Sequence, residues 1–229
     1  MHYINLKEVD TDGAIQEAAD AVAGDTRLSF LRKAGVAGGA AVGGGALLSA
    51  LVPGAAMAAT YSRPPASYGA GDIGILNFAL TLEYLERAFY NEATAKGKIK
   101  GAQLKKFLKT VTADERAHVS FLKGALGKKA VKEPKFDFKG IPEHEAMFAA
   151  TAQVLENTGV HAYLGQAGNI KNPAYLIAAA TIVTIEARHS GAIGLINKAG
   201  GGIAPSGPFD KPLGATAILA AVTGTGFIV

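Results

Sequence analysis

The sequence contains no cysteine and no tryptophan. Without cysteine the chain can form neither a disulfide framework nor a thiolate metal site. A metal ion bound by this protein would therefore be held by carboxylate, imidazole or carbonyl groups. The chain has 229 residues, of which 49% are hydrophobic, so it is long enough to bury the core of a compact domain.

Charge is absent from residues 34–59, a stretch rich in glycine and alanine that follows three basic residues. A basic region, an apolar region and the small residues Ala56 and Ala58 are typical of a cleaved signal. The alternative is an uncleaved anchor that contacts the membrane, since about 20 apolar residues span a bilayer. The glycines and Pro53 favour cleavage. We therefore predict residues 1–58 to be an N-terminal extension and export signal, which places the protein in the periplasm, the cell envelope or outside the cell.

The stretch "TRLSFLRKAG" at residues 26–35 resembles the twin-arginine export motif. Arg27, Phe30 and Arg32 match that motif, but Leu28 stands where the second arginine belongs. The resemblance implies export of a folded chain, and the departure at Leu28 leaves the route open.

The formal net charge is +4, and lysines gather between Lys96 and Lys139. A solvated helix face followed by a basic loop is the expected explanation, because no repeated aromatic residues accompany the lysines. We expect no nucleic-acid partner. Contact with an anionic wall polymer or a membrane is the alternative for this basic region.

Apolar residues recur at helical spacing in four segments, 72–96, 102–126, 142–167 and 174–198. Asp72 is the expected N-cap of the first helix. Residues 59–71 read as an extended leader, and residues 200–229 as a tail with one short helix. Short links within each pair and the longer link 128–141 predict an all-α four-helix bundle at residues 72–199, made of two helical hairpins joined by a long crossover.

Two pairs of helices repeat the same polar pattern. Glu115 and His118 on the second helix correspond to Glu186 and His189 on the fourth. The other two helices each carry a glutamate followed seven residues later by a tyrosine, and these residues are Glu83, Tyr90, Glu156 and Tyr163. Each pair shares a helix face at such spacing. The pattern indicates a duplicated helical hairpin.

Buried charge gives the pattern a chemical meaning. A single glutamate and histidine pair at this spacing is usually an exposed helix face, but here apolar residues surround all four glutamates. Four buried carboxylates would repel one another and lose their hydration. Divalent cations reverse that balance and accept neutral imidazoles as further ligands. We therefore predict two divalent metal ions as cofactors.

These residues resemble the ferritin-like superfamily, in which two helices each supply a Glu and two others each supply Glu-x-x-His to a di-iron or di-manganese centre. The resemblance implies that the two metal ions are iron or manganese. Three features are similar to an exported, desiccation-related bacterial branch of that superfamily. They are the export signal, the opening of the first helix ("ILNFALTLEYLERAFY") and the segment "PFDKPLG" of the tail. The resemblance implies that Glu83 and Glu156 are terminal ligands, Glu115 and Glu186 bridging ligands, and His118 and His189 nitrogen donors.

The same resemblance implies that Tyr90 and Tyr163 are catalytic groups that hydrogen-bond a ligand carboxylate or a bound oxygen species. Glu86 faces nearly the same way as Glu83 and is either a further ligand or, as we favour, a rim residue paired with Arg87 or Arg116. His161 is expected to point away from the site, and His144 to be exposed.

Three functions fit these expectations. The first is an oxidoreductase in stress protection that acts on Fe(II), dioxygen or peroxide. The second is a metal storage or sequestration protein, for which a homo-oligomeric shell is expected. The third is a structural protein whose metal ions only hold the bundle together. The superfamily hosts all three, so the resemblance alone does not select one.

Overall fold

The structure is a computed structural model that describes residues 61–199 and 202–229. The predicted export signal at residues 1–58 lies outside the described residues. In the described ranges, none of the helices has both the length and the hydropathy needed to span a bilayer.

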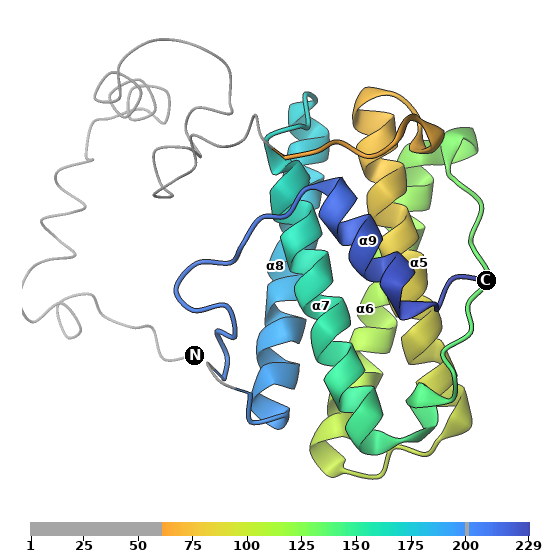
Figure 1. Cartoon of the computed structure of the whole chain (residues 1–229), viewed down its shortest axis with the longest axis vertical. Helices are drawn as coiled ribbons and strands as arrows, with labels where there is room; N and C mark the ends of the chain where they lie inside the picture. Colours follow the sequence, from red (N-terminus) through yellow and green to blue (C-terminus); the bar gives the residue numbers. More distant parts are fainter. Residues whose placement is uncertain (1–60, 200–201) are drawn as a thin grey trace, which may run out of the picture. The chain divides into compact units, whose positions relative to one another are not determined.

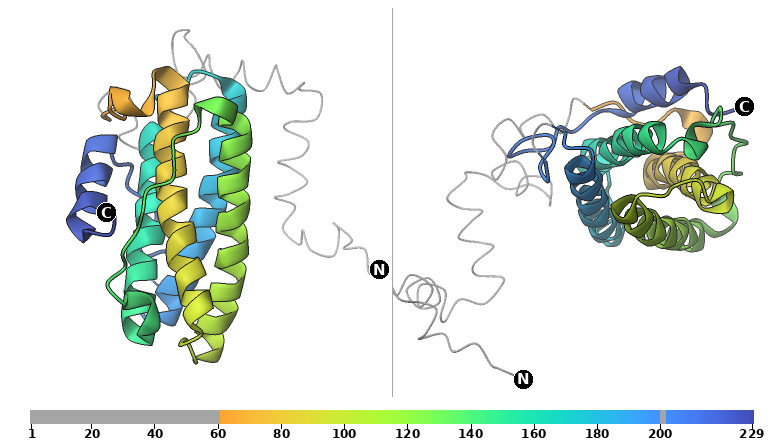
Figure 2. Two further views of the ribbon diagram at one scale, coloured as in Figure 1. Left: turned by 90° about the vertical axis from the view of Figure 1, so that its right-hand side faces the viewer. Right: turned by 90° about the horizontal axis from the view of Figure 1, so that it is seen from below.

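Five α-helices make up most of the described chain: α5 (Gly71–Lys96), α6 (Ala102–Leu126), α7 (Glu145–Ala167), α8 (Pro173–Ile196) and α9 (Ala215–Thr225). α5 packs along α6 and α7 along α8, and further contacts join α5 to α7 and α6 to α8. Seen end-on, these four helices surround a common centre, and α9 lies outside them (Figures 1 and 2). The predicted all-α four-helix bundle of two hairpins is confirmed.

Side-chain burial explains why each helix lies where it does. α6 is amphipathic, and it turns Leu104, Leu108 and Leu122 inward while its lysines face solvent. α5 is buried on nearly all sides from Gly74 to Glu86. The remaining lysines between residues 96 and 139 are also exposed, as expected for a solvated basic surface.

The crossover between the hairpins runs along the outside of the bundle, between two short 3-10 helices (Gly127–Lys129 and Ile141–Glu143). Phe138 anchors it by packing edge-on against Phe89 and Phe227. The C-terminal residues pair with the same segment, since the Asp137 amide donates to the Phe227 carbonyl at 2.8 Å. The short helix expected in the tail is α9, which packs on α7.

Two expected helix starts are wrong. Pro142 lies in the 3-10 helix, and α7 begins only at Glu145, because His144 is in an extended conformation. Asp72 is not an N-cap either, since α5 starts at Gly71. The Asp72 carboxylate instead accepts hydrogen bonds from the amides of Lys171 (2.9 Å) and Asn172 (2.8 Å), in the turn before α8. It therefore ties the start of one hairpin to the turn of the other.

Replacing Asp72 by alanine removes both of these bonds. We expect Asp72→Ala to lower the free energy of unfolding by about 1–3 kcal/mol, because both amides lose a charged acceptor. Urea unfolding of the metal-free chain measures this change. Asp210→Ala, at an exposed aspartate, is the control, and an equal effect of both substitutions would contradict the assigned role.

Candidate metal centre

The six predicted ligand residues come together in the middle of the bundle, and we call them the cluster. Glu115 and His118 lie on α6 and face Glu186 and His189 on the neighbouring α8, while α5 supplies Glu83. Glu156 of α7 completes the set. All four glutamates have an exposed fraction of 0%, so this is a layer of carboxylates inside the core.

His118 directs a single nitrogen at three carboxylates. Its Nδ1 atom lies 3.2 Å from Glu83 Oε2, 3.2 Å from Glu115 Oε2 and 3.1 Å from Glu186 Oε1. One ring nitrogen carries at most one proton and can donate it to one acceptor at a time. The surrounding oxygens are therefore not all satisfied by this imidazole.

His189 repeats this arrangement in the second hairpin. Its Nδ1 atom lies 3.2 Å from both Glu115 Oε1 and Glu156 Oε2, and its Nε2 atom lies 3.0 Å from Asp114 Oδ2. A carboxylate bonded to one ring nitrogen holds the proton there and leaves the other nitrogen free as a ligand. Asp114 of α6 thus orients His189 of α8.

Both predicted tyrosines contact the carboxylate of a predicted ligand on the neighbouring hairpin. Tyr163 donates its hydroxyl proton to Glu83 Oε1 at 2.6 Å. Tyr90 makes the corresponding bond to Glu156 Oε1. Burial, together with the charge of the bonded glutamate, raises the pKa of both phenols well above the usual value. The two tyrosines therefore remain protonated donors.

Burial also raises the pKa values of two carboxyl groups in the cluster. The pKa of Glu115 rises to about 8, assisted by the charge of Glu83, and the pKa of Glu186 rises well above its usual value. Glu83 behaves differently, because its contacts with His118 outweigh burial and lower its pKa.

The pKa values of the two imidazoles are raised, whereas burial alone lowers the pKa of a histidine. Burial would lower the pKa of His189, but contacts with Glu115 and Glu156 outweigh it and raise the pKa to about 11. Contacts with carboxylates likewise raise the pKa of His118 far above its usual value. The cluster therefore retains protons unless another positive charge replaces them.

The residues present fit metal ions. Two groups of four residues could each hold a metal ion, because within each group one potential ligand atom per residue lies within 4.8 Å of the others. One group surrounds His118 (Glu83, Glu115, His118, Glu186), and the other surrounds His189 (Glu115, Glu156, Glu186, His189). Separations of 3.1–3.2 Å match neighbouring ligand atoms of an octahedral ion with bonds of about 2.1 Å. Both Glu186 oxygens and Glu115 Oε1 are buried without a hydrogen-bond partner. Such orphaned oxygens are the atoms that a cation would satisfy.

Glu86 is not the rim residue we favoured from the sequence. Its side chain is 3% exposed, and burial together with the charge of Glu186 raises its pKa well above the usual value. The expected arginine partners bond elsewhere, Arg87 to Glu133 and Arg116 to Asn91. Glu86 is therefore a fifth buried carboxylate beside the cluster.

A glycine creates the room for Glu86. A Cβ atom at Gly159 would lie 2.8 Å from Glu186 Oε2 and 3.2 Å from Glu86 Oε1. Gly159 stands three residues after Glu156, as Glu86 stands three residues after Glu83. The two halves of the repeat thus differ at this position, where one brings a carboxylate and the other leaves space for it. Sequence reasoning missed Gly159, although its place in the repeat marked the asymmetry.

The two other histidines of the described residues, His144 and His161, lie away from the cluster, as expected. His144 is exposed at the start of α7. His161 is half-buried, and burial lowers its pKa. Its carbonyl oxygen accepts a hydrogen bond from the Leu213 amide at 3.0 Å, so His161 lies under the C-terminal tail.

Adding a methyl group at Gly159 tests this close packing. Alanine normally stabilises a helix over glycine by about 1 kcal/mol. Gly124 of α6 has open space around it, and we expect Gly124→Ala to show that gain. Gly159→Ala should instead displace Glu186 and weaken metal binding. Metal titration and urea unfolding measure the two effects, and unchanged metal affinity in Gly159→Ala would contradict this account.

The proton-retaining cluster predicts the pH dependence of the metal-free protein. Carboxylates and imidazoles with raised pKa values take up protons on folding, so their stabilisation is lost as pH rises through the folded pKa values. The lowered pKa of Glu83 has an effect only below its usual range. We expect stability to fall by about 1.4 kcal/mol per pH unit for each proton taken up, between about pH 5 and about pH 9.

Thermal unfolding midpoints of chelator-treated and metal-loaded protein across that range check this expectation. Because metal ions displace the retained protons, metal affinity should rise with pH over the same interval. A metal-free midpoint that is constant or rises toward about pH 9 would contradict the described electrostatics.

Comparison with known proteins agrees with the fold and with the buried acidic and histidine groups. None of the curated proteins compared with the chain matches it. A family model described as the ferritin-like domain matches residues 71–198, which is more than half of the chain and includes every residue of the cluster. The chain therefore belongs to the ferritin-like domain family.

Proposed function

We propose that the protein is a dimetal-carboxylate oxidoreductase that consumes dioxygen or peroxide in stress protection outside the cytoplasm. The observation that carries this proposal is the layer of five buried carboxylates, three of whose oxygens have no hydrogen-bond partner. A purely structural core gains nothing from such groups, since each unpaired buried charge costs several kcal/mol. A pair of iron or manganese ions, when bound, would supply a place where an oxygen species accepts two electrons.

The residues of the cluster would have different roles as ligands of that pair of metal ions. His118 and His189 would provide the nitrogen ligands through Nδ1, and Glu115 and Glu186 lie between them as the shared carboxylates. Glu83 would complete the group around His118, as Glu156 would around His189. We assign these roles because Glu115 and Glu186 belong to both groups of neighbouring residues, whereas Glu83 and Glu156 each belong to one.

The two tyrosines position the carboxylates of Glu83 and Glu156. Each tyrosine binds Oε1 of its glutamate and leaves Oε2 directed at a histidine nitrogen. The tyrosines therefore fix which oxygen is available to a metal ion. Apolar side chains above and below the cluster exclude water, which strengthens each electrostatic contact inside it.

As a ferroxidase, the protein would take Fe(II) as its substrate. Two Fe(II) ions would each lose one electron, and dioxygen would take up both electrons and two protons to give hydrogen peroxide. As a peroxide-consuming enzyme it would oxidise two Fe(II) ions by one electron each and pass both electrons to hydrogen peroxide, which with two protons gives two water molecules. Sequence features at residues 26–58 support export, because they resemble a signal.

Loading the purified full chain with iron or manganese tests the function. We expect two metal ions per chain and consumption of dioxygen or peroxide faster than free metal at the same concentration. Asp114→Asn should lower metal affinity about 10–100-fold, because His189 loses its orienting carboxylate. Glu133→Gln, at an exposed residue, should change neither property.

Rates equal to those of free metal would reject the oxidoreductase. Retention of many iron ions per chain in a particle far above 23.4 kDa would favour storage instead. Two tightly bound ions without turnover would leave only a structural role.

A further inference from the structure

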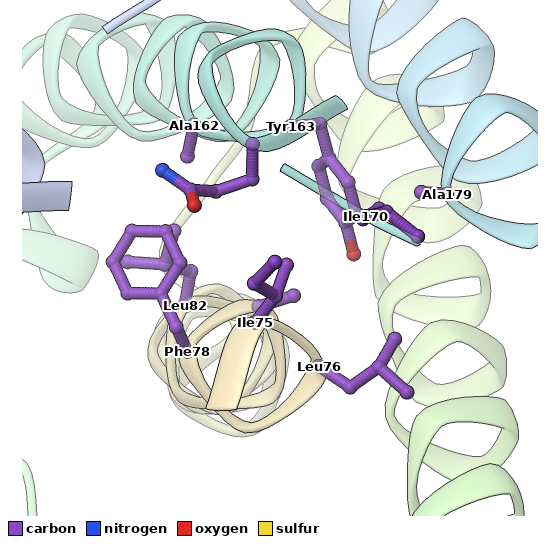
Figure 3. Close-up of a pocket in the computed structure, with 10 residues that line it drawn as sticks. Ile75, Leu76, Phe78, Leu82, Ala162, Tyr163, Ile170 and Ala179 are labelled. Carbon is purple, nitrogen blue, oxygen red and sulfur yellow. The ribbon is translucent and has the colours of Figure 1, made fainter. Parts of the chain in front are cut away.

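A small apolar cavity lies beside the cluster, between the first half of α5, the end of α7 and the start of α8. Its volume is 20 Å³, which holds about one molecule the size of water. Figure 3 shows side chains of α5 and α7 facing one another across it, among them Leu76, Leu82 and Ala162. Ala179 of α8 lies in the wall beside Tyr163.

The only amide side chain in this wall has its polar atoms engaged outside the cavity. Gln166 donates to the Ser62 carbonyl at 2.9 Å and accepts a hydrogen bond from Asn169 at 3.0 Å. A water molecule in the cavity would therefore find few partners, and apolar cavities of this kind remain dry.

Tyr163 connects the cavity to the cluster. Its ring is part of the cavity wall, and its hydroxyl group donates to Glu83 Oε1 at 2.6 Å. Leu82, also in the wall, directly precedes Glu83 in the chain. A small molecule in the cavity is thus one side chain away from a ligand carboxylate.

The corresponding tyrosine of the other hairpin packs against aromatic rings. The Tyr90 ring packs edge-on against Phe89 (5.4 Å between ring centroids), Phe107 (6.1 Å) and Phe148 (6.1 Å). The wall beside Tyr163 includes three alanines, at residues 79, 162 and 179, together with larger apolar side chains such as Phe78. The two tyrosines therefore differ in their surroundings, because Tyr163 borders a cavity and Tyr90 packs against three phenylalanine rings.

We propose that this cavity is a binding site for dioxygen, which makes dioxygen the oxidant of the proposed oxidoreductase. Dioxygen is apolar and loses no hydrogen bonds on entering a dry cavity. Hydrogen peroxide carries two hydroxyl groups and would lose its bonds to water without replacement, which costs several kcal/mol. The cavity therefore selects dioxygen over peroxide. This inference deepens the proposed function and rests on it for the kinetic part only.

Xenon binding tests the cavity independently of any reaction. Xenon occupies dry apolar cavities, so xenon-pressurised crystals of the metal-free full chain should show an atom beside Tyr163. Ala179→Val should remove this atom by filling the cavity. Ala180→Val, at the exposed neighbour on the same helix, should leave it in place. Absence of xenon from the parent protein, or its retention in Ala179→Val, would overturn the proposal whatever the protein catalyses.

Kinetics of the metal-loaded protein test the selection. Ala179→Val should slow the reaction with dioxygen several-fold and leave metal stoichiometry and the reaction with hydrogen peroxide unchanged. Ala162→Val, which fills the cavity from α7, should act in the same way and guards against poor folding of one variant. Equal slowing with dioxygen and peroxide would overturn the selection. Xenon binding with no reaction in any variant would reject the oxidoreductase and leave the cavity as a gas-binding site.

Discussion

Burial of negative charge is the constraint on which the rest of this structure depends. Five carboxylates share one layer of the bundle with only two imidazoles. One hydrophobic cluster packs against the layer through Tyr90 and a second through Tyr163. The apolar packing of these clusters has to offset the repulsion within the layer. Cations in the layer would replace that repulsion by attraction between all four helices, so metal binding and folding should be strongly linked.

The helices and the residues that meet in the cluster were predictable because both depend on local spacing. Apolar periodicity gave the ends of α6 at Ala102 and Leu126, and the Glu-x-x-His repeat identified side chains that share one face. The starts of α5 and α7 were less predictable, since Asp72 and Pro142 fit helix starts by residue type alone. The Asp72 carboxylate instead accepts hydrogen bonds from the amides of a turn about 100 residues away in the chain, and a local sequence pattern does not predict such a contact.

Glu86 shows the same limit within the site. From the sequence it was a glutamate one turn from a ligand and next to Arg87, and such residues are usually solvated. Its burial depends on Gly159, which lies on another helix and matters only because it lacks a side chain. Asp114 is the reverse case, because its position beside Glu115 points it away from its own helix's ligand and toward His189 of α8. Duplicated hairpins therefore predict a symmetric ligand set, and the departures from symmetry appear only when the helices are packed together.

Those departures give the two sides of the cluster different properties. Around Tyr90, aromatic rings fill the space and hold the phenol rigidly, so a small molecule entering there would have to displace a phenylalanine. Beside Tyr163, a small cavity remains that costs packing energy, about 1 kcal/mol for a methyl-sized gap. A void maintained next to a charged cluster is otherwise a weakness, because water reaching the carboxylates would weaken their interactions with bound cations. An apolar lining avoids that conflict, because water gains no hydrogen-bond partners in the cavity and the proposed dioxygen molecule needs none.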